Sequence, residues 1–465
     1  MNTPRDTWSG RLGFLLATIG SAVGIGSIWK FPYEVGSNGG GAFVLCYVVG
    51  LALIVVPLMF AEFAIGRRGG GDPAASMRAV LQNGGPSAGN PGGPSSHWGA
   101  VGISGVITGF LILSFYAVIG GWMLGYAIDT AANGLAGATA QSVKAHYEAF
   151  LASPAQMTLY HAIFMAATAV IVARGVANGI EAASKVLMPI LFVLMLALAA
   201  YSIVEGDFAA TLRYLFVPDL AHLTARTALD AIGLGFFSIG VGLGLMITYA
   251  AHAGIEVNLR QIAIWSVLAD TVISFLAGFA VFPVVFAHGL DPAAGPGLVF
   301  VTLPLAFAQM PFGTVAASGF FLLLFIAALA SAISMLELVV AMLTRRFDWS
   351  QSKATTIAAS LCFVAGIATV LSFNLWSGWH PLAGLSDRPG IHSATLFDLL
   401  DYLTSNVLLP AGGFGLAVFA GWVVPRKLLD EELGLSRTGA RALHFLLRYV
   451  APVGIAAVGI GSMFS

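Results

Sequence analysis

Apolar residues gather into eleven long runs, separated by short polar or glycine-rich stretches. Each run is long enough to cross about 30 Å of hydrocarbon as a helix. The predicted spans are residues 11–36, 41–66, 99–130, 156–173, 180–204, 228–252, 261–287, 314–344, 354–373, 395–424 and 442–464. The pattern predicts an all-α integral membrane protein with eleven transmembrane helices.

Composition agrees with a bilayer as the solvent. The chain is 58% hydrophobic and 9% charged, unlike a soluble globular protein. Its 21 basic and 22 acidic residues leave no basic surface for nucleic acid, so membrane lipid is the expected surrounding and nucleic acid is not an expected partner. Cys46 and Cys362 lie in apolar runs without a CxxC partner, which indicates neither a disulfide framework nor a metal site.

The distribution of basic residues predicts the orientation. With a cytoplasmic N-terminus, fifteen of the 21 Lys and Arg residues fall on inside ends and loops. We therefore expect a multi-pass protein of the inner (plasma) membrane, with a cytoplasmic N-terminus and an extracytoplasmic C-terminus. The glycine-rich stretch 82–97 is predicted as a cytoplasmic loop and 380–393 as an outer loop.

Glycines interrupt two of the spans in a similar way. The sequence VGIG at 23–26 recurs as VGLG at 241–244, although glycine inside a helix costs about 0.5–1 kcal/mol relative to alanine. Glycine-interrupted spans in corresponding positions of two halves are typical of an inverted-repeat transporter. We predict unwound first and sixth helices, repeats at 1–205 and 206–424, and an additional C-terminal helix within 425–465. The freed backbone groups would face a ligand.

Several blocks carry a family resemblance that covers essentially the whole chain. They are GSIWKFP (26–32), NGGGAF (38–43), PLMFAEFAIGR (57–67), YAVIGGWMLGYA (116–127), LADTVISFLAGFAVFP (268–283), ASAISMLELVVA (330–341) and LLDYLTSNVLLP (399–410). These blocks resemble the neurotransmitter:sodium symporters, most of all the bacterial amino-acid branch. The resemblance implies a symporter rather than an enzyme, with sodium as the coupling ion and a small amino acid as the substrate. It does not indicate an oligomeric state.

The resemblance implies two sodium sites built from oxygen ligands. The first would use the Ala22 carbonyl with Ser27, Ser238 and Asp270, and the second the carbonyls of Gly20, Val23 and Ala327 with the Ser331 hydroxyl. Ser27 stands where the family usually has Asn, and Ala330 stands where it usually has a further oxygen ligand. One or two sodium ions are therefore expected.

Asp270 and Gly24 refine the expected substrate and ion dependence. The resemblance implies that animal relatives have Asn at the position of Asp270 and that chloride supplies a negative charge beside their first sodium ion. An acid at this position therefore predicts chloride-independent transport. Monoamine-transporting relatives carry Asp at the position of Gly24, so Gly24 leaves room for a substrate carboxylate, which Tyr116 would bind. The implied substrate site, with a lean toward hydrophobic or aromatic amino acids, comprises Val23, Gly24, Gly26, Tyr116, Phe237, Ser238, Gly240, Leu243, Ser331, Ser334 and Met335.

The same resemblance implies two gates. Lys30 and Asp401 match an outer ion pair, Phe237 matches an aromatic lid, and Arg5 with Trp8 matches an inner latch. The expected acidic partner of Arg5 is missing, because Arg345 and Arg346 stand in its place. Glu62 and Glu337 are interpreted as helix-packing carboxylates.

Two other carriers remain open. One is a proton-coupled amino-acid carrier that uses Asp270 or Glu62, and the other is a sodium-coupled carrier of a different small carboxylate, such as an osmolyte. A channel would not need two broken helices around an enclosed site. An enzyme is not indicated, since the sequence has no HExxH motif and its nine histidines are scattered.

Overall fold

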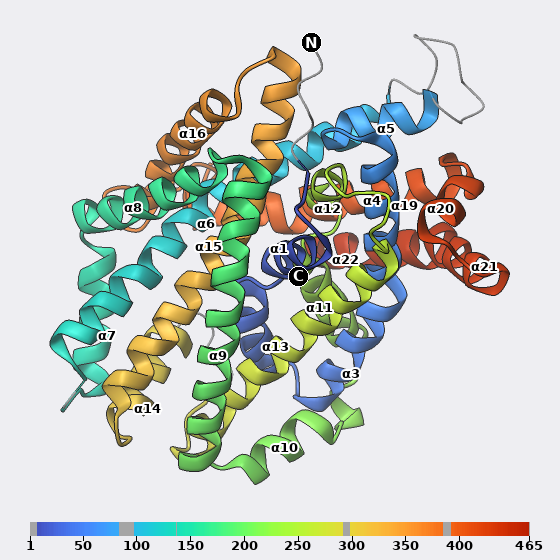
Figure 1. Ribbon diagram of the computed structural model, residues 1–465. Helices are drawn as coiled ribbons and strands as arrows, with labels where there is room; N and C mark the ends of the chain where they lie inside the picture. Colours follow the sequence, from blue (N-terminus) through green and yellow to red (C-terminus); the bar gives the residue numbers. More distant parts are fainter. Residues whose placement is uncertain (1–6, 83–96, 136, 292–297, 385–391, 465) are drawn as a thin grey trace.

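A computed structural model describes residues 7–82, 97–135, 137–291, 298–384 and 392–464. Arg5 of the predicted inner latch lies outside these residues, as do residues 83–96 and 385–391 of the two predicted loops. The described chain is helical throughout and contains no strand (Figure 1). The all-α prediction is therefore confirmed.

The helices follow the predicted spans to within a few residues. The continuous spans are Gly41–Gly69 (α3, η2 and α4), Gly99–Asn133 (α6), Pro154–Val172 (α8), Val176–Glu205 (η4 and α9), Leu259–Ala287 (α13), Gly313–Phe347 (α15), Gln351–Ser372 (α16), Leu396–Val423 (α18, η7, α19 and η8) and Arg437–Phe464 (α21, η9 and α22). These nine, within the described ranges, are long and apolar enough to cross a membrane. The chain is thus a multi-pass membrane protein.

The first and sixth predicted spans are each broken in two. The first consists of α1 (Arg11–Ala22), followed by η1 (Gly26–Lys30) and α2 (Phe31–Ser37), with a bend of 53° between the two parts. The sixth consists of α11 (Ala225–Ile239) and α12 (Leu245–Ala250). The unwound first and sixth helices are confirmed, whereas the repeat boundaries after residues 205 and 424 stay a prediction.

Short helices connect the spans, and the hydrophobic pattern did not predict them. They are α5 (Pro73–Gln82), α7 (Ala140–Leu151), α10 (Phe208–Phe216), η5 (Leu220–His222), η6 with α14 (Leu298–Ala308) and α20 (Arg426–Leu433). Polar side chains cap several of them: Asp207 accepts the Ala210 N–H at the start of α10. These helices are too short to span a bilayer.

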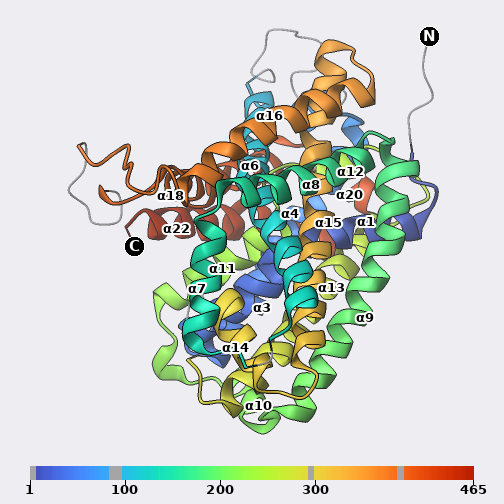
Figure 2. The ribbon, with the colours of Figure 1, turned by 90° about the vertical axis from the view of Figure 1, so that its left-hand side faces the viewer.

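The spans pack around α15. The most apolar stretch of α15 is 83% buried, against 33% for α9, so α15 forms the centre of the bundle and α9 its lipid-facing rim. α6 packs along α15, and α1 packs against α9, α13 and α15. Figure 2 shows α1 on the right and α22 on the left, so the first and last spans lie on different sides of the bundle.

Candidate functional site

The break in the first span frees backbone groups in the middle of the bundle. α1 ends at Ala22, and Val23 is extended, with φ −82° and ψ 103°. Here glycine permits close packing: a Cβ added to Gly24 would lie 2.6 Å from Ser331 Oγ, and one added to Gly26 would lie 3.1 Å from Ser238 Cα. The glycines of VGIG thus let other helices approach the break.

The break in the sixth span has a different physical basis. Gly240, Gly242 and Gly244 have φ values of 70°, 93° and 86°, in the left-handed region that disfavours other residues. The buried carboxylate of Glu62 accepts the N–H groups of Gly242 (2.6 Å) and Met246 (3.1 Å). Glu62 therefore satisfies backbone donors that unwinding leaves without helical partners, in agreement with its packing role.

A cavity of about 50 Å³ lies between the two breaks. Nine predicted substrate residues line it: Gly24, Gly26, Tyr116, Phe237, Ser238, Gly240, Leu243, Ser331 and Met335. The Tyr116 hydroxyl accepts the Ile25 N–H at 3.3 Å, which places this hydroxyl beside the first break. Val23 and Ser334 do not line the cavity. The Ser334 hydroxyl instead donates to the Ser331 carbonyl (2.7 Å).

Asp270 stands at the centre of a cluster of hydroxyl groups. Its Oδ1 accepts the Ser27 hydroxyl and, at 3.4 Å, the Ser238 hydroxyl, and the two serine oxygens are 2.8 Å apart. Tyr47 donates to Oδ2 at 3.3 Å. Asp270 is fully buried, and no Lys, Arg or His within the described chain forms an ion pair with it. Such an all-oxygen group with one negative charge suits a hard cation.

A second oxygen cluster surrounds Ser331. Its hydroxyl lies 3.5, 3.4 and 3.3 Å from the carbonyl oxygens of Gly20, Ser21 and Val23. Ala327, the remaining predicted ligand of this site, is buried on the same helix. The cluster therefore unites the freed carbonyls of the first break with one hydroxyl of α15.

A vestibule of about 640 Å³ opens on the side of the bundle where Lys30 lies, which is the predicted outer side. Phe237 and Leu409 line both this vestibule and the smaller cavity, so both side chains lie at the boundary between the two spaces. The role of Phe237 as a lid stays a prediction. The predicted Lys30–Asp401 ion pair is not formed: Lys30 Nζ lies 4.5 Å from the centre of the Phe237 ring, and Asp401 accepts the Ser405 hydroxyl. Lys30 lines the vestibule, and so does Ser405, the hydrogen-bond partner of Asp401.

Trp8 packs at the N-terminal end of the first span, which is the predicted inner end. Its indole Nε1 donates to the Tyr249 carbonyl at 2.9 Å, and its ring packs edge-on against Tyr249 of α12. The neighbouring Ser9 donates its N–H to Glu181 (2.8 Å), which also pairs with Lys185 (2.6 Å). The segment before α1 is thus bound to both α12 and η4.

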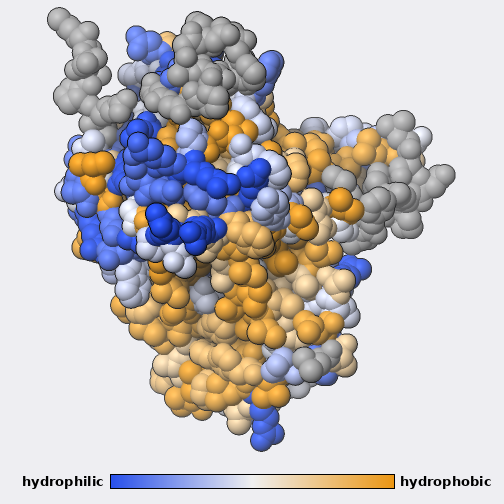
Figure 3. Space-filling view, turned by 90° about the vertical axis from the view of Figure 1, so that its right-hand side faces the viewer, coloured by the Kyte–Doolittle hydropathy of each residue, from blue (hydrophilic) through white to orange (hydrophobic). Residues whose placement is uncertain are grey.

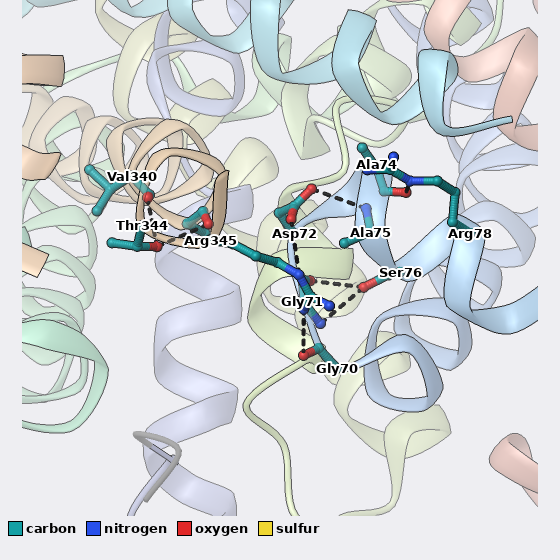
Figure 4. A network of polar contacts seen from close by, with 11 residues as sticks. Gly70, Gly71, Asp72, Ala74, Ala75, Ser76, Arg78, Val340, Thr344 and Arg345 are labelled. Carbon is teal, nitrogen blue, oxygen red and sulfur yellow. Dashed lines mark hydrogen bonds and ion pairs between the residues drawn. The ribbon is translucent and has the colours of Figure 1, made fainter. Parts of the chain in front are cut away.

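Arg345 makes a further contact on the predicted inner side, which the sequence did not predict. Figure 4 shows its side chain extending from the end of α15 toward the turn between α4 and α5. Arg345 donates to the Gly70 carbonyl at 3.4 Å and lies 3.9 Å from the Asp72 carboxylate, which itself accepts the Ala75 N–H (3.1 Å). The basic residue that displaces the expected acid therefore has a partner of its own.

Sequence reasoning missed several residues of the site. Tyr47 lies in an apolar run with no polar neighbour to distinguish it, and only its contact with Asp270 reveals a role. Five cavity residues were also missed because apolar and small side chains in spans resemble ordinary packing: Ser21, Ile25, Ile112, Leu245 and Leu409.

Comparison with known proteins agrees with this geometry. The family model described as "Sodium:neurotransmitter symporter family" matches residues 5–148 and 148–382. An uncharacterized sodium-dependent transporter of Bacillus subtilis, YhdH, is 36% identical over 456 residues, which are 96% of this chain and 95% of that protein. One from Haemophilus influenzae is 30% identical, with coverage of 100% and 99%.

A solved structure shares the whole fold. The crystal structure of MhsT in complex with L-phenylalanine superposes with a TM-score of 0.86 at 39% identity, and the match covers 99% of this chain and 100% of MhsT.

Proposed function

The chain belongs to the Sodium:neurotransmitter symporter family, a family of transporters rather than enzymes, and from this premise we propose that it imports a neutral, hydrophobic or aromatic amino acid together with sodium. Transport proceeds by alternating access around the cavity between the two helix breaks, with α1 entering from the cytoplasm. The observation that carries the proposal is the position of this cavity between the Asp270 and Ser331 oxygen clusters.

The first sodium ion binds at Asp270. An ionised carboxylate in the centre of a span costs about 2.5–3.5 kcal/mol, and a bound cation offsets this cost. We assign the Ala22 carbonyl to this site together with the Ser27 and Ser238 hydroxyl groups, which donate to Asp270, and Tyr47 donates to the second carboxylate oxygen. Because Asp270 supplies the negative charge, transport does not require chloride.

A second sodium ion binds beside Ser331. Support comes from the convergence of its hydroxyl with the carbonyls of Gly20 and Val23. The methyl group of Ala330 contributes no ligand, so this site holds its ion with one oxygen fewer and binds it more weakly than the first. Because the second site binds its ion more weakly, one or two sodium ions accompany each substrate molecule.

The substrate carboxylate binds near Gly24 and the Tyr116 hydroxyl, where helix breaks offer backbone donors. The side chain lies among apolar residues, which favours hydrophobic or aromatic substrates. These residues are Ile112, Phe237, Leu243, Leu245 and Met335. L-Phenylalanine in the MhsT crystal structure supports this substrate class. A bound amino acid exceeds 50 Å³, so the cavity widens on binding, and Met335 is a flexible side chain in its lining.

Thermal unfolding of the purified protein tests the proposal. L-Phenylalanine, L-leucine, glycine and GABA are each added in sodium and in potassium at equal ionic strength, with and without chloride. We expect the hydrophobic amino acids to raise the melting temperature only in sodium and equally in both anions. Stabilisation that ignores sodium but changes with pH would overturn sodium coupling and favour the proton-coupled carrier.

A further inference from the structure

A pocket of about 590 Å³ lies between α20 and α21, away from the transport cavity. Its lining includes four arginines, which are Arg426, Arg437, Arg441 and Arg448. Asp430 is the one acidic residue in the lining. Figure 3 looks onto this face, where hydrophilic side chains gather over α20 and α21 and the surface beneath them becomes hydrophobic. The pocket is thus strongly basic and lies at the border of the apolar surface.

The acidic residues nearby are already paired with other groups. Asp430 accepts from His444 Nε2 at 3.0 Å, and Glu431 lies 3.7 Å from Lys427. Glu432 pairs with Arg67 at 2.7 Å. None of the four pocket arginines forms an ion pair with an Asp or Glu of the described chain. Their charges are therefore available to an external anion.

Arg448 shows that the basic charge extends toward the lipid. It lies within the last span, with its guanidinium 4.0 Å from the Trp422 ring centre and 5.8 Å from that of Tyr449. Its Nε is buried and, among the described residues, has no hydrogen-bond partner. Trp422, Phe445 and Tyr449 are 54%, 58% and 48% exposed, and such aromatic side chains are typical of the membrane interface.

We propose that this pocket binds the phosphate group of an anionic phospholipid. Guanidinium groups bind phosphate oxygens through paired hydrogen bonds, and basic pockets between spans at a membrane interface suit such headgroups. The exposed aromatic side chains provide an apolar surface for the adjoining acyl chains. On the predicted orientation, the site faces the cytoplasmic leaflet.

The test compares how lipids with the same acyl chains but different headgroups affect the melting temperature of the whole protein in uncharged detergent. The melting temperature is followed during titration with phosphatidylglycerol, phosphatidylcholine or inorganic phosphate. The test variant is Arg437→Gln/Arg441→Gln. The control is Arg174→Gln/Arg213→Gln, which removes two exposed arginines outside the pocket. Circular dichroism verifies that both variants remain helical.

Phosphatidylglycerol should stabilise the wild type and the control at lower concentration than phosphatidylcholine does. The pocket variant should need roughly 20- to 30-fold more, since each arginine near anionic lipid contributes roughly fivefold in affinity. Equal responses to both lipids, or an unchanged response of a folded pocket variant, would overturn the proposal. Full stabilisation by inorganic phosphate alone would overturn the lipid assignment and indicate a site for free phosphate.

Discussion

Replacement of Asp270 by Asn tests the first sodium site with little change in shape. A sodium ion about 3 Å from the carboxylate gains roughly 5 kcal/mol at an effective dielectric constant of about 20. The amide oxygen remains a ligand, and the cost of burying the charge disappears. We therefore expect a net loss of about 3 kcal/mol, or roughly 150-fold in apparent sodium affinity.

Thermal unfolding in sodium and in potassium measures this loss. At a sodium concentration about 100 times the wild-type Kd, the stabilisation should fall from about 2.7 to about 0.3 kcal/mol. In potassium, Asp270→Asn should melt no lower than the wild type, because a buried charge without its cation has been removed. This second result separates ion binding from misfolding.

The matched control is Asp348→Asn, which removes an exposed carboxylate after α15. Asp348 has φ 53°, a conformation that Asn adopts readily, so its backbone is not disturbed. The control should retain the full sodium response. If Asp270→Asn retains it as well, the assignment of Asp270 as a sodium ligand is refuted.

Four further changes test other parts of the site. Ser331→Ala should lower apparent sodium affinity about tenfold, and an unchanged sodium dependence of uptake would show that no ion binds there. Gly24→Ala places a methyl group 2.6 Å from Ser331 Oγ and 3.0 Å from the Tyr116 hydroxyl; calorimetric titration should detect no amino-acid binding to a folded variant. Tyr116→Phe should raise the substrate KM roughly 10- to 100-fold through the lost charge-assisted hydrogen bond, and a normal KM would place the carboxylate elsewhere. Arg345→Gln should change the free energy of unfolding by less than about 1 kcal/mol, since the side chain is half-exposed. It should nevertheless increase amide hydrogen exchange in α5, and unchanged exchange would show that the contact of Arg345 with Asp72 does not stabilise this helix.

The positions of the gates could not be predicted from sequence matching alone. Lys30 lies over Phe237 instead of pairing with Asp401, and Arg345 reaches the turn at Asp72. Long basic side chains sample many rotamers, so their partners depend on which groups the packed helices bring within reach. The order of charged residues along the chain does not give the distances between them in the folded protein.

The two glycine motifs show the same limit at the level of the backbone. VGIG and VGLG look equivalent, and both correctly located a break. Only the fold distinguishes them, because Gly24 is needed for contact with Ser331, whereas Gly242 is needed for its positive φ and is held by Glu62. A positive φ and a close contact with another helix both favour glycine, so the presence of glycine in the sequence does not tell which of the two reasons applies.

The sequence by itself determined the all-helical membrane class, the approximate ends of the spans and the two breaks. These features depend on local properties, namely the length of apolar runs and the helix propensity of glycine. The tertiary structure decided which oxygens meet: Tyr47 joins Asp270 across 223 positions of the chain, and Ser331 reaches Val23 across 308. Such meetings depend on how the spans cross and rotate against one another, which is set by packing of the whole bundle and leaves no local pattern.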